Sequence, residues 1–368
     1  MRNLFWDFWD CHQSWSASLL RLGGLIPPLL LLLAAQTHES ATLFPILKHG
    51  KWGYARGPGE IVIPPQFDHA AGFSEGLALV TLGHKWGFVD ERGKLVARPQ
   101  FDWAWEFSGG LAAVKVKDEW GFLDRTGRLV IQPKFADAGS FHEGLAPVSV
   151  VQSGDKLRFG YIDQTGTFVV KPQFVSADEF SEGVATVVLE GTYDRMEDNR
   201  GVRSGKCGYA DTTGAIVIQP QYDDARSFSG GFAAVEIGNK WGYIDKSGRM
   251  VITPQFSQAG TFSGGEAPVS VGKEPYDKWG FIDQAGDWIV KPRFDGASQF
   301  SEGFAAVGSG DKWGYIDKSG EWVIKAQFYG AEDFHNGLAR IMIGGPETKA
   351  PRLGYIDREG RVVWKPTN

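Results

Sequence analysis

The sequence predicts an all-β protein built from nine copies of a unit of about 34 residues. One phrase, Lys-Trp-Gly-Tyr-Ile-Asp-Lys-Ser-Gly, stands identically at residues 240–248 and 312–320, and looser copies recur along most of the chain. A fixed minimum spacing of 34 residues with occasional excess indicates one supersecondary unit plus insertions, as in solenoids and propellers. The glycines that mark the phrase are Gly53, Gly87, Gly121, Gly160, Gly208, Gly242, Gly280, Gly314 and Gly354.

Each unit contains three strand-like stretches, which in the unit around Gly314 are residues 304–307, 313–317 and 321–325. Short apolar runs between turn signals predict strands, and we expect these three to form an antiparallel meander. The link at residues 317–320 predicts a three-residue hairpin loop. Its Asp accepts a hydrogen bond from the backbone two residues on, and its Gly supplies a positive φ. The Asp/Gly pair recurs at 90/93, 124/127, 163/166, 211/214, 245/248, 283/286 and 357/360.

The third stretch has Val or Ile at its centre, usually with apolar neighbours, as at Val130, Val169 and Ile289. This run predicts a strand buried on both faces, and the proline that follows it predicts the strand's end. An apolar pattern of period three comes next, which fits one or two helical turns or a tight loop that packs unit against unit. The position after its second Phe is usually Ser but is His at 142 and 335, which predicts a tolerant surface site.

Two arrangements of the nine units remain open. We expect an open, solenoid-like superhelix of three-stranded antiparallel β meanders, and the alternative is a closed β-propeller-like ring. Propellers typically have four to eight blades of four strands, whereas this chain has nine units of three. Because each repeat contacts mainly its neighbours, residues 41–368 are predicted to form one repeat domain.

The consensus K-W-G-Y-I-D-x-x-G-x-x-V-I-x-P-Q-F-D-x-A-x-x-F-S-E-G-L-A-x-V resembles the WG (KWG) repeats of bacterial proteins from residue 43 to residue 366. The resemblance implies a β-repeat binding module and supplies no catalytic residues.

Residues 1–40 lie outside the repeat and are predicted to be a leader. The apolar run at 25–35 is too short to span a bilayer as a helix, but it suits the hydrophobic region of a signal peptide. Leu33-Ala34-Ala35 offers small residues for cleavage. Because residues 1–18 are acidic and Trp-rich, we expect the true start nearer Leu19. The expected protein is exported from a bacterium, to the periplasm or beyond, without stable membrane insertion after cleavage.

All four insertions fall between the first and second stretches of a unit, which predicts that they lie on one edge, a usual place for binding loops. The longest, residues 189–206, is charged and Gly-rich and is expected to bury little and to lie outside the core. Cys207 stands where the phrase has Trp, and we expect it to be a small buried substitute.

Several function classes are disfavoured by the sequence. A net charge of −6 argues against a nucleic-acid partner. The chain has no H-E-x-x-H motif and no phosphate-binding Gly-rich loop. Each Asp-x-x-Gly turn offers one or two carboxylates, whereas hard cations need six or more oxygens. We therefore predict neither an enzyme nor a cofactor or metal site.

Aromatic side chains are the better indication of function. Six tryptophans belong to the repeated phrase and are expected to pack, whereas Trp364 and four candidate ligand-binding tryptophans stand outside it. For Trp288 and Trp322 the sequence leaves open core filling or an exposed platform for sugar rings. We predict a non-catalytic scaffold that contacts a protein partner through the insertion-bearing edge. The alternative is a carbohydrate or cell-wall binding module. The candidate ligand-binding residues are Trp103, Trp105, Trp288, Trp322 and Tyr193.

Overall fold

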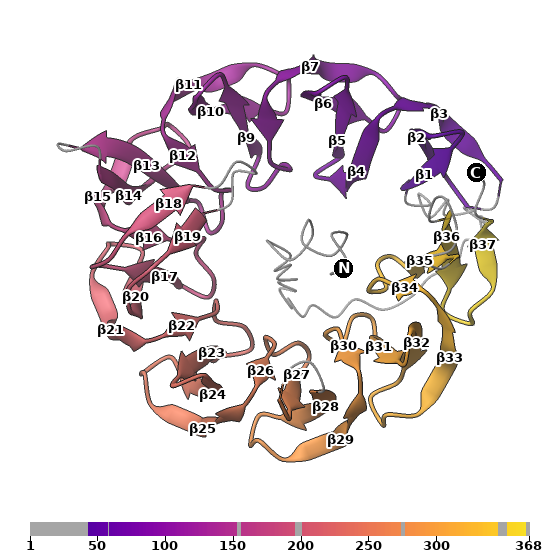
Figure 1. Cartoon of the computed structure of the whole chain (residues 1–368). Coiled ribbons are helices and arrows are strands. Elements are labelled where there is room, and N and C mark those ends of the chain that lie inside the picture. Colours follow the sequence, from indigo (N-terminus) through magenta and orange to yellow (C-terminus); the bar gives the residue numbers. More distant parts are fainter. Residues whose placement is uncertain are drawn as a thin grey trace, which may run out of the picture. The chain divides into compact units, whose positions relative to one another are not determined.

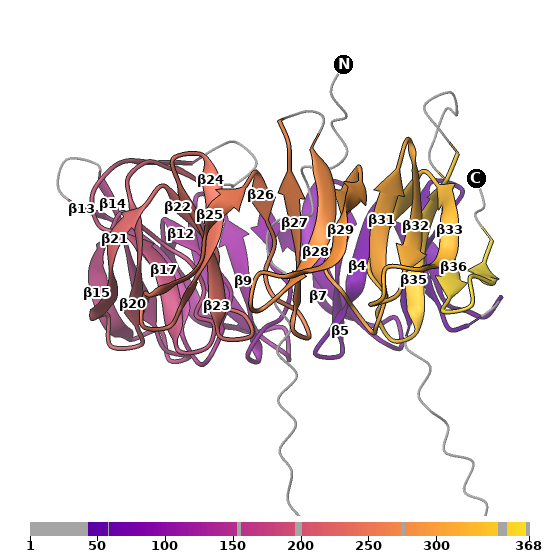
Figure 2. The same ribbon diagram turned by 90° about the horizontal axis from the view of Figure 1, so that it is seen from below.

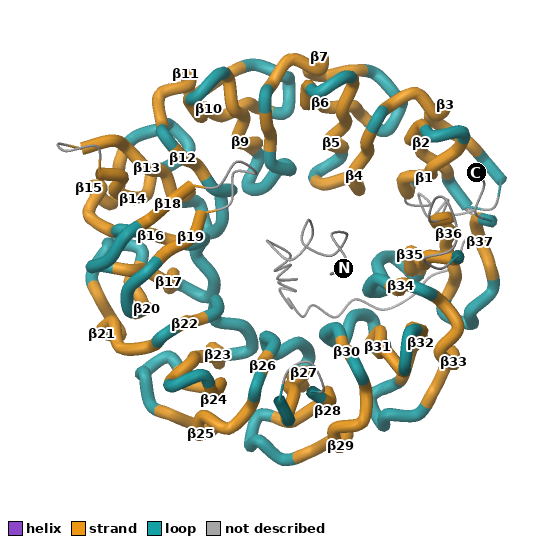
Figure 3. Tube along the Cα trace, in the orientation of Figure 1, coloured by secondary structure: helices purple, strands orange, loops and turns teal. Residues whose placement is uncertain are grey.

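The computed structural model describes residues 43–57, 59–152, 156–195, 201–273, 277–344 and 352–365. Within these residues the chain forms strands, turns and bends, and no helix (Figure 3). The predicted leader and its signal sequence lie outside the described residues and stay predictions. From residue 41 on, the chain forms one unit, a ring of nine small sheets that we call blades (Figure 1). This confirms the all-β fold of nine repeated antiparallel sheets.

Within each blade the strands lie side by side in order from the centre of the ring to its rim, and we name them inner, second, third and outer. The inner strands are β4 (His69–Ser74), β8 (Trp103–Ala104), β12 (Asp137–Ala138), β16 (Ser176–Ala177), β22 (Asp224–Ala225), β26 (Gln258–Ala259), β30 (Gly296–Ala297) and β34 (Gly330–Ala331). The second strands are β1 (Phe44–Lys48), β5 (Leu77–Leu82), β9 (Leu111–Val116), β13 (Ala146–Gln152), β17 (Val184–Val188), β23 (Phe232–Ile237), β27 (Glu266–Val271), β31 (Ala305–Ser309) and β35 (Leu338–Ile343).

The third strands carry the repeated phrase: β2 (Lys51–Ala55), β6 (Lys85–Asp90), β10 (Glu119–Asp124), β14 (Lys156–Ile162), β20 (Cys207–Asp211), β24 (Lys240–Asp245), β28 (Lys278–Asp283), β32 (Lys312–Ile316) and β36 (Arg352–Asp357). The outer strands are β3 (Ile61–Phe67), β7 (Leu95–Phe101), β11 (Leu129–Phe135), β15 (Phe168–Phe174), β21 (Ile216–Tyr222), β25 (Met250–Phe256), β29 (Trp288–Phe294), β33 (Trp322–Phe328) and β37 (Val362–Trp364). One further hairpin, β18 (Tyr193–Arg195) and β19 (Gly201–Arg203), belongs to the longest insertion.

Blades are numbered along the chain, from blade 1 (β1–β3) to blade 9 (β34–β37). Within the described residues blade 1 has three strands and the other eight have four, all antiparallel. The added strand is the inner one, which is only two residues long in seven blades. It explains the apolar pattern of period three, because that segment forms a two-residue strand and a tight loop instead of helical turns.

The ring closes where blade 9 meets blade 1, so the closed ring and not the open superhelix is the arrangement. The Tyr355 hydroxyl donates a hydrogen bond of 2.8 Å to the Pro45 carbonyl oxygen. The rings of Phe44 and Tyr355 pack 4.5 Å apart between centroids, and Trp364 lies buried beside them. The equivalent tyrosines bond to a carbonyl of the following blade, as Tyr54 does to Ala71 at 2.8 Å. Closure therefore uses the same framework tyrosine, but the acceptor lies on the second strand β1, because blade 1 has no inner strand in the described residues.

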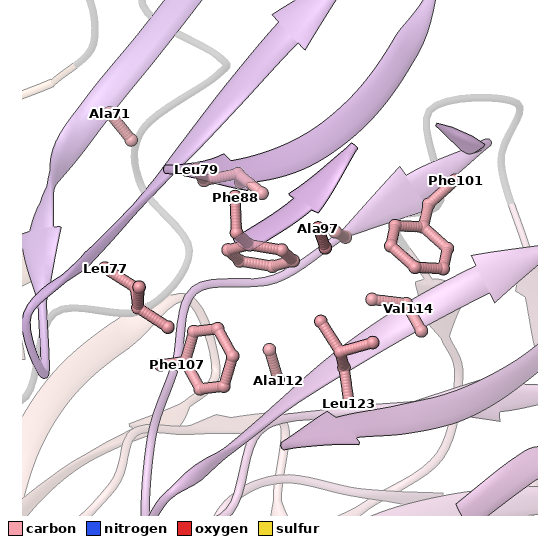
Figure 4. Packing of buried hydrophobic residues seen from close by; sticks show 11 residues of the cluster. Ala71, Leu77, Leu79, Phe88, Ala97, Phe101, Phe107, Ala112, Val114 and Leu123 are labelled. Carbon is pink, nitrogen blue, oxygen red and sulfur yellow. The ribbon is translucent and has the colours of Figure 1, made fainter. Parts of the chain in front are cut away.

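The hydrophobic core lies between blades. Figure 4 shows the cluster between blades 2 and 3, where Phe88 of β6 meets Phe107 of the next blade. Their ring centroids are 4.9 Å apart, at an edge-to-face angle of 69°. Each such aromatic pair contributes about 0.5–1.5 kcal/mol beyond its buried area. The predicted role of the second Phe in packing unit against unit is confirmed.

The outer strand differs from its prediction. Val130, Val169 and Ile289 are 42%, 49% and 38% exposed, so the expectation of burial on both faces was wrong. The outer strands lie at the rim (Figure 1), where neighbouring blades diverge and leave alternate side chains in solvent. The proline does not end the strand either, because β7 continues through Pro99 to Phe101.

The proline instead lies in a bulge that explains the glycine of the repeated phrase. In blade 3, Trp120 pairs with Phe135 and Phe122 with Ile131, so β11 has extra residues opposite Gly121. A Cβ on Gly121 would lie 2.5 Å from the Ile131 carbonyl oxygen and 2.7 Å from the Pro133 nitrogen. Only glycine leaves room for this close backbone approach.

The end of each blade that carries the Asp-x-x-Gly turns also carries serine side chains that bond to the next blade. The hairpin loops have the predicted form: in blade 2, Arg92 N–H donates to Asp90 Oδ1 at 3.0 Å, and Gly93 has φ +84°. The serine after the second Phe is not a tolerant surface site, because its hydroxyl donates to a carbonyl of the next blade. Ser108 reaches Phe141 at 2.6 Å, and five other serines do the same: Ser74, Ser181, Ser229, Ser263 and Ser301.

Candidate ligand-binding surface

The two faces of the ring carry different connections. We call the face where second strands turn into third strands the insertion face. The four long connections join β13 to β14, β17 to β20, β27 to β28 and β35 to β36, so all of them leave the blades at this face. Figure 2 shows the strands running between the two faces. The tryptophan of the phrase also stands at the insertion face, because it is the second residue of the third strand.

Six side chains on this face form a continuous aromatic row across blades 1 to 3. Successive ring centroids are 5.3–6.1 Å apart. The last two rings are stacked with 8° between their planes. In order, the aromatic row is Trp52, His69, Trp86, Trp103, Trp105 and Trp120.

Three members of the row are not part of the repeat framework. His69 and Trp103 hold one variable position of the inner strand, which is Asp, Ser, Gln or Gly in the other blades. Trp105, two residues on, corresponds to Ala, Gly, Asp, Arg, Ser or Glu elsewhere. Because the other blades form without aromatic residues at these positions, the fold does not require them there.

The row is left uncovered by its own blades. In blades 1 to 3 the second and third strands are joined by two-residue turns, for example between Val116 and Glu119. Trp52, Trp86, Trp103 and Trp105 are therefore partly exposed. Trp120 is fully buried and supports the end of the row from below.

The charges beside the row are paired with one another. Lys51 Nζ lies 2.5 Å from Asp68 Oδ1, and Lys85 makes the same ion pair with Asp102 in the next blade. The hydrogen bonds from Lys51 and Lys85 lower the pKa values of the two Asp carboxyls. These exposed pairs add little stability, but they match each of the two lysine charges with a carboxylate.

Two titratable side chains at the row are shifted toward their neutral forms. Burial lowers the pKa of the His69 imidazole, and burial also raises the pKa of the Glu106 carboxyl, next in sequence to Trp105. In the described part of the chain, His69 Nδ1 and Trp103 Nε1 have no hydrogen-bond partner. Trp105 Nε1, by contrast, donates to the Ala138 carbonyl oxygen at 3.1 Å.

A family model described as "WG containing repeat" matches eight segments that together cover most of the chain. The matched residues are 52–86, 86–120, 120–150, 159–193, 208–241, 241–274, 279–313 and 313–345. The chain belongs to the WG-repeat family. A search of curated proteins finds no match.

Solved structures resemble the WG-repeat ring only at low identity. A dipeptidyl peptidase 4 of Porphyromonas gingivalis has 9% identity and a TM-score of 0.47, over 89% of this chain and 58% of its own. A prolyl endopeptidase has 11% identity and a TM-score of 0.46, over 89% of this chain and 50% of its own. The dihydro-heme d1 dehydrogenase NirN has 12% identity and a TM-score of 0.43, over 92% and 76%. The chain thus spans about half the length of the two peptidases.

The WG repeats of blades 4 and 5 lack the tryptophan, and the longest insertion supplies an aromatic ring in its place. Phe159 and Cys207 hold the Trp position there, and Cys207 is buried as predicted. Tyr193 of the insertion packs edge-on against Phe159, with centroids 4.9 Å apart. It also contacts the core cluster that contains Cys207. Its hydroxyl donates to Asp137 Oδ2 of blade 4 at 2.7 Å.

The described residues of 189–206 are mostly exposed, as expected, but Leu189 and Tyr193 are partly buried, so the expectation that the insertion stays outside the core was wrong for these two residues. Residues 196–200 lie outside the described residues. The insertion forms the β18–β19 hairpin, and Leu189 and Tyr193 pack on the cores of blades 4 and 5. A hollow of about 470 Å³ remains at its base, lined by Leu189, Glu190, Gly205, Lys206 and Pro220.

The remaining predicted site residues lie apart from the row. Trp288 and Trp322 are first residues of outer strands at the rim, where each packs edge-on against a Phe of the preceding blade. Trp288 is 37% exposed and Trp322 is partly buried, so each combines packing with exposure. Trp364 is buried at the closure of the ring. Only Trp103 and Trp105, of the five predicted ligand-binding residues, are brought together.

Sequence reasoning missed His69, Trp52, Trp86 and Glu106. His69 could have been found, since it holds the same variable repeat position as Trp103. Glu106 follows Trp105 directly and also stands outside the consensus. Trp52 and Trp86 could not have been found, because a framework tryptophan has the same sequence context whether its side chain is exposed or buried in the structure.

Proposed function

We propose that this chain is an exported, non-catalytic binding scaffold that contacts a protein partner through its insertion face. The observation that supports the proposal most is the segregation of the four long connections to one face of the ring. Loops gathered on a rigid β framework are a common way to build binding surfaces. The opposite face has short hairpin loops, of which the Asp-x-x-Gly turns are nearly identical from blade to blade.

A non-catalytic role is supported by the distribution of reactive side chains. The described residues contain no group of three or more His, Cys, Asp or Glu side chains placed to hold a metal ion. The eight Asp-x-x-Gly carboxylates are engaged with the backbone of their own turns, as Asp317 is with Ser319 and Glu321 at 2.9 and 3.1 Å. Among the described residues no helix is long and apolar enough to cross a membrane.

A photo-crosslinking experiment tests the proposed face. A benzoylphenylalanine is placed either at Lys273, exposed at the β27–β28 connection, or at Ala285, exposed in the β28–β29 turn of the same blade. Each protein is expressed with its leader and irradiated in the producing cells, and crosslinked partners are identified by mass spectrometry. We expect a defined protein partner from Lys273 and none from Ala285. Equal crosslinking from both positions, or crosslinking from Ala285 alone, contradicts the proposal.

A carbohydrate ligand is the second candidate, and the aromatic row on the insertion face favours it. Because the row and the insertions occupy different blades, the two ligands need not compete.

Fusing residues 1–45 to a reporter that is active only outside the cytoplasm tests export, and a silent reporter contradicts it.

A further inference from the structure

The aromatic row has features of a ligand-binding surface that packing between blades does not explain. Trp103 and Trp105 hold positions that the repeat does not reserve for aromatic residues. Trp103 Nε1 and His69 Nδ1 lack hydrogen-bond partners in the described structure, and an unpaired buried polar group costs about 1–3 kcal/mol. The framework Trp120 also has an unpaired Nε1 among the described residues. What distinguishes Trp103 is its departure from the repeat, at a position where Asp, Ser, Gln or Gly also folds.

The shape of the row limits the class of ligand. Four partly exposed indoles follow one another across three blades, with neighbouring rings in contact. A row of this kind fits an extended chain that presents one flat apolar face after another. A compact ligand, by contrast, needs a concave pocket that buries most of its surface.

The charged side chains beside the row limit the class of ligand further. Lys51 and Lys85 are each engaged by an aspartate of the next inner-strand segment. An anionic polymer would have to break these pairs to bind Lys51 or Lys85. Lys115, opposite Trp103 and Trp120 in the sheet, is a third cation beside the row and lies near the Asp102 carboxylate.

We propose that the aromatic row is a binding site for an extended neutral polysaccharide, whose sugar rings lie against Trp52, Trp86, Trp103 and Trp105. The site is separate from the insertions of blades 4, 5, 7 and 9. The proposal adds a ligand class to the insertion face and does not depend on the protein partner.

The test uses the full chain and soluble neutral glycans of known composition: hydroxyethylcellulose, xyloglucan, galactomannan and glycogen. Affinity electrophoresis and titration calorimetry are run on the unaltered protein, on Trp103→Ala and on Trp103→Ala with Trp105→Ala. The matched control is Trp288→Ala with Trp322→Ala, which removes two indoles from the rim. Circular dichroism and thermal unfolding establish that each variant folds. Trp103→Ala alone keeps the test valid if loss of the Trp105–Ala138 hydrogen bond unfolds the double variant.

We expect at least one of the neutral glycans to bind, with about a tenfold weaker association for Trp103→Ala, corresponding to one lost stacking contact of about 1.4 kcal/mol, and an unchanged association for the rim control. No binding of any of the four glycans overturns the proposal. So does loss of binding in the rim control with the row variants unaffected, or preferential binding of an anionic polymer or a proline-rich peptide. Partner crosslinking from Lys273 is read on the same variants, so failure here is distinguished from failure of the protein-binding proposal.

Discussion

Blades 3 and 5 fill the same place at the insertion face in opposite ways. Blade 3 keeps the framework Trp120 and adds Trp103 and Trp105 beside it, under a two-residue turn. Blade 5 has Cys207 instead, and its insertion brings in Tyr193 from outside. Where the repeat lacks its indole, a ring is imported to complete the packing. Where the indole is present, the further rings pack against the same core cluster but stand at positions that the repeat does not reserve for aromatic residues, and we assign them to binding.

The largest expected effect concerns the glycine of the repeated phrase, which blades 3 and 5 share. Gly121→Ala and Gly208→Ala each place a Cβ 2.5 Å from a carbonyl oxygen of the outer strand. Backbone on both sides cannot yield, so we expect each to destabilise the protein by more than about 4 kcal/mol or to prevent folding. Gly72→Ala is the matched control, because no atom lies within 4 Å of its Cβ position. Denaturant unfolding that finds all three variants alike would contradict this account of the phrase.

The next effect separates an aromatic residue that packs from one that binds. Tyr193→Ala removes a ring wedged between blades 4 and 5, and we expect a loss of about 2–4 kcal/mol. Tyr193→Phe, which loses only the bond to Asp137, should cost about 1 kcal/mol. Trp103→Ala should stay within about 1 kcal/mol of the unaltered protein, because its partly exposed indole also carries an unpaired N–H. A reversed order of Tyr193→Ala and Trp103→Ala would contradict the comparison.

Restoring the missing indole of blade 5 gives a sharper test of the comparison between blades 3 and 5. Cys207→Trp inserts a large ring where the Tyr193 cluster already packs, and we expect a loss of about 1–3 kcal/mol from overpacking. Combining Cys207→Trp with Tyr193→Ala should be less destabilising than the sum of the two single changes, by at least about 0.5 kcal/mol. A double-mutant cycle with strictly additive free energies would show that Tyr193 does not stand in for the indole.

The smallest effect concerns Glu106, whose carboxyl pKa is raised by burial. The folded protein then holds this proton more tightly than the unfolded chain does. Stability is therefore lost as pH rises from the ordinary Glu pKa of about 4.3 through the raised value. Glu106→Gln should increase the melting temperature slightly at pH 7.5, and the gain should vanish near pH 4. A gain that is the same at both pH values would show that ionisation of Glu106 is not its cause.

Most of the fold could be predicted from the sequence because it repeats. Eight occurrences of Asp-x-x-Gly fix the hairpins, and nine occurrences of the phrase fix the number of blades. Closure could not be predicted, because Tyr355 is the same framework residue as Tyr54 and only its surroundings differ: the next blade it meets is the first. Exposure of the outer strand escaped prediction for a similar reason, since Val130 has apolar neighbours in sequence but lies at the rim in space.

The candidate site was half predictable. Trp103 and Trp105 stand out because they break the consensus, whereas Tyr193 stood out for the same reason and proved to pack. Composition alone made the insertion look unburied, but one ring and one hydrogen bond to Asp137 are enough to fix it.

Side-chain footprinting of the free protein tests the central claim most directly, because it needs no ligand. Hydroxyl radicals oxidise accessible indoles, and peptide mass spectrometry reports the rate at each tryptophan. Trp288, 37% exposed, and Trp120, fully buried, give the fast and slow reference rates. We predict that Trp52, Trp86 and Trp103 are oxidised at rates near that of Trp288 and that the Tyr193 peptide is protected. Rates for Trp86 and Trp103 as slow as that of Trp120, with Tyr193 readily oxidised, would contradict an open aromatic row beside a closed insertion.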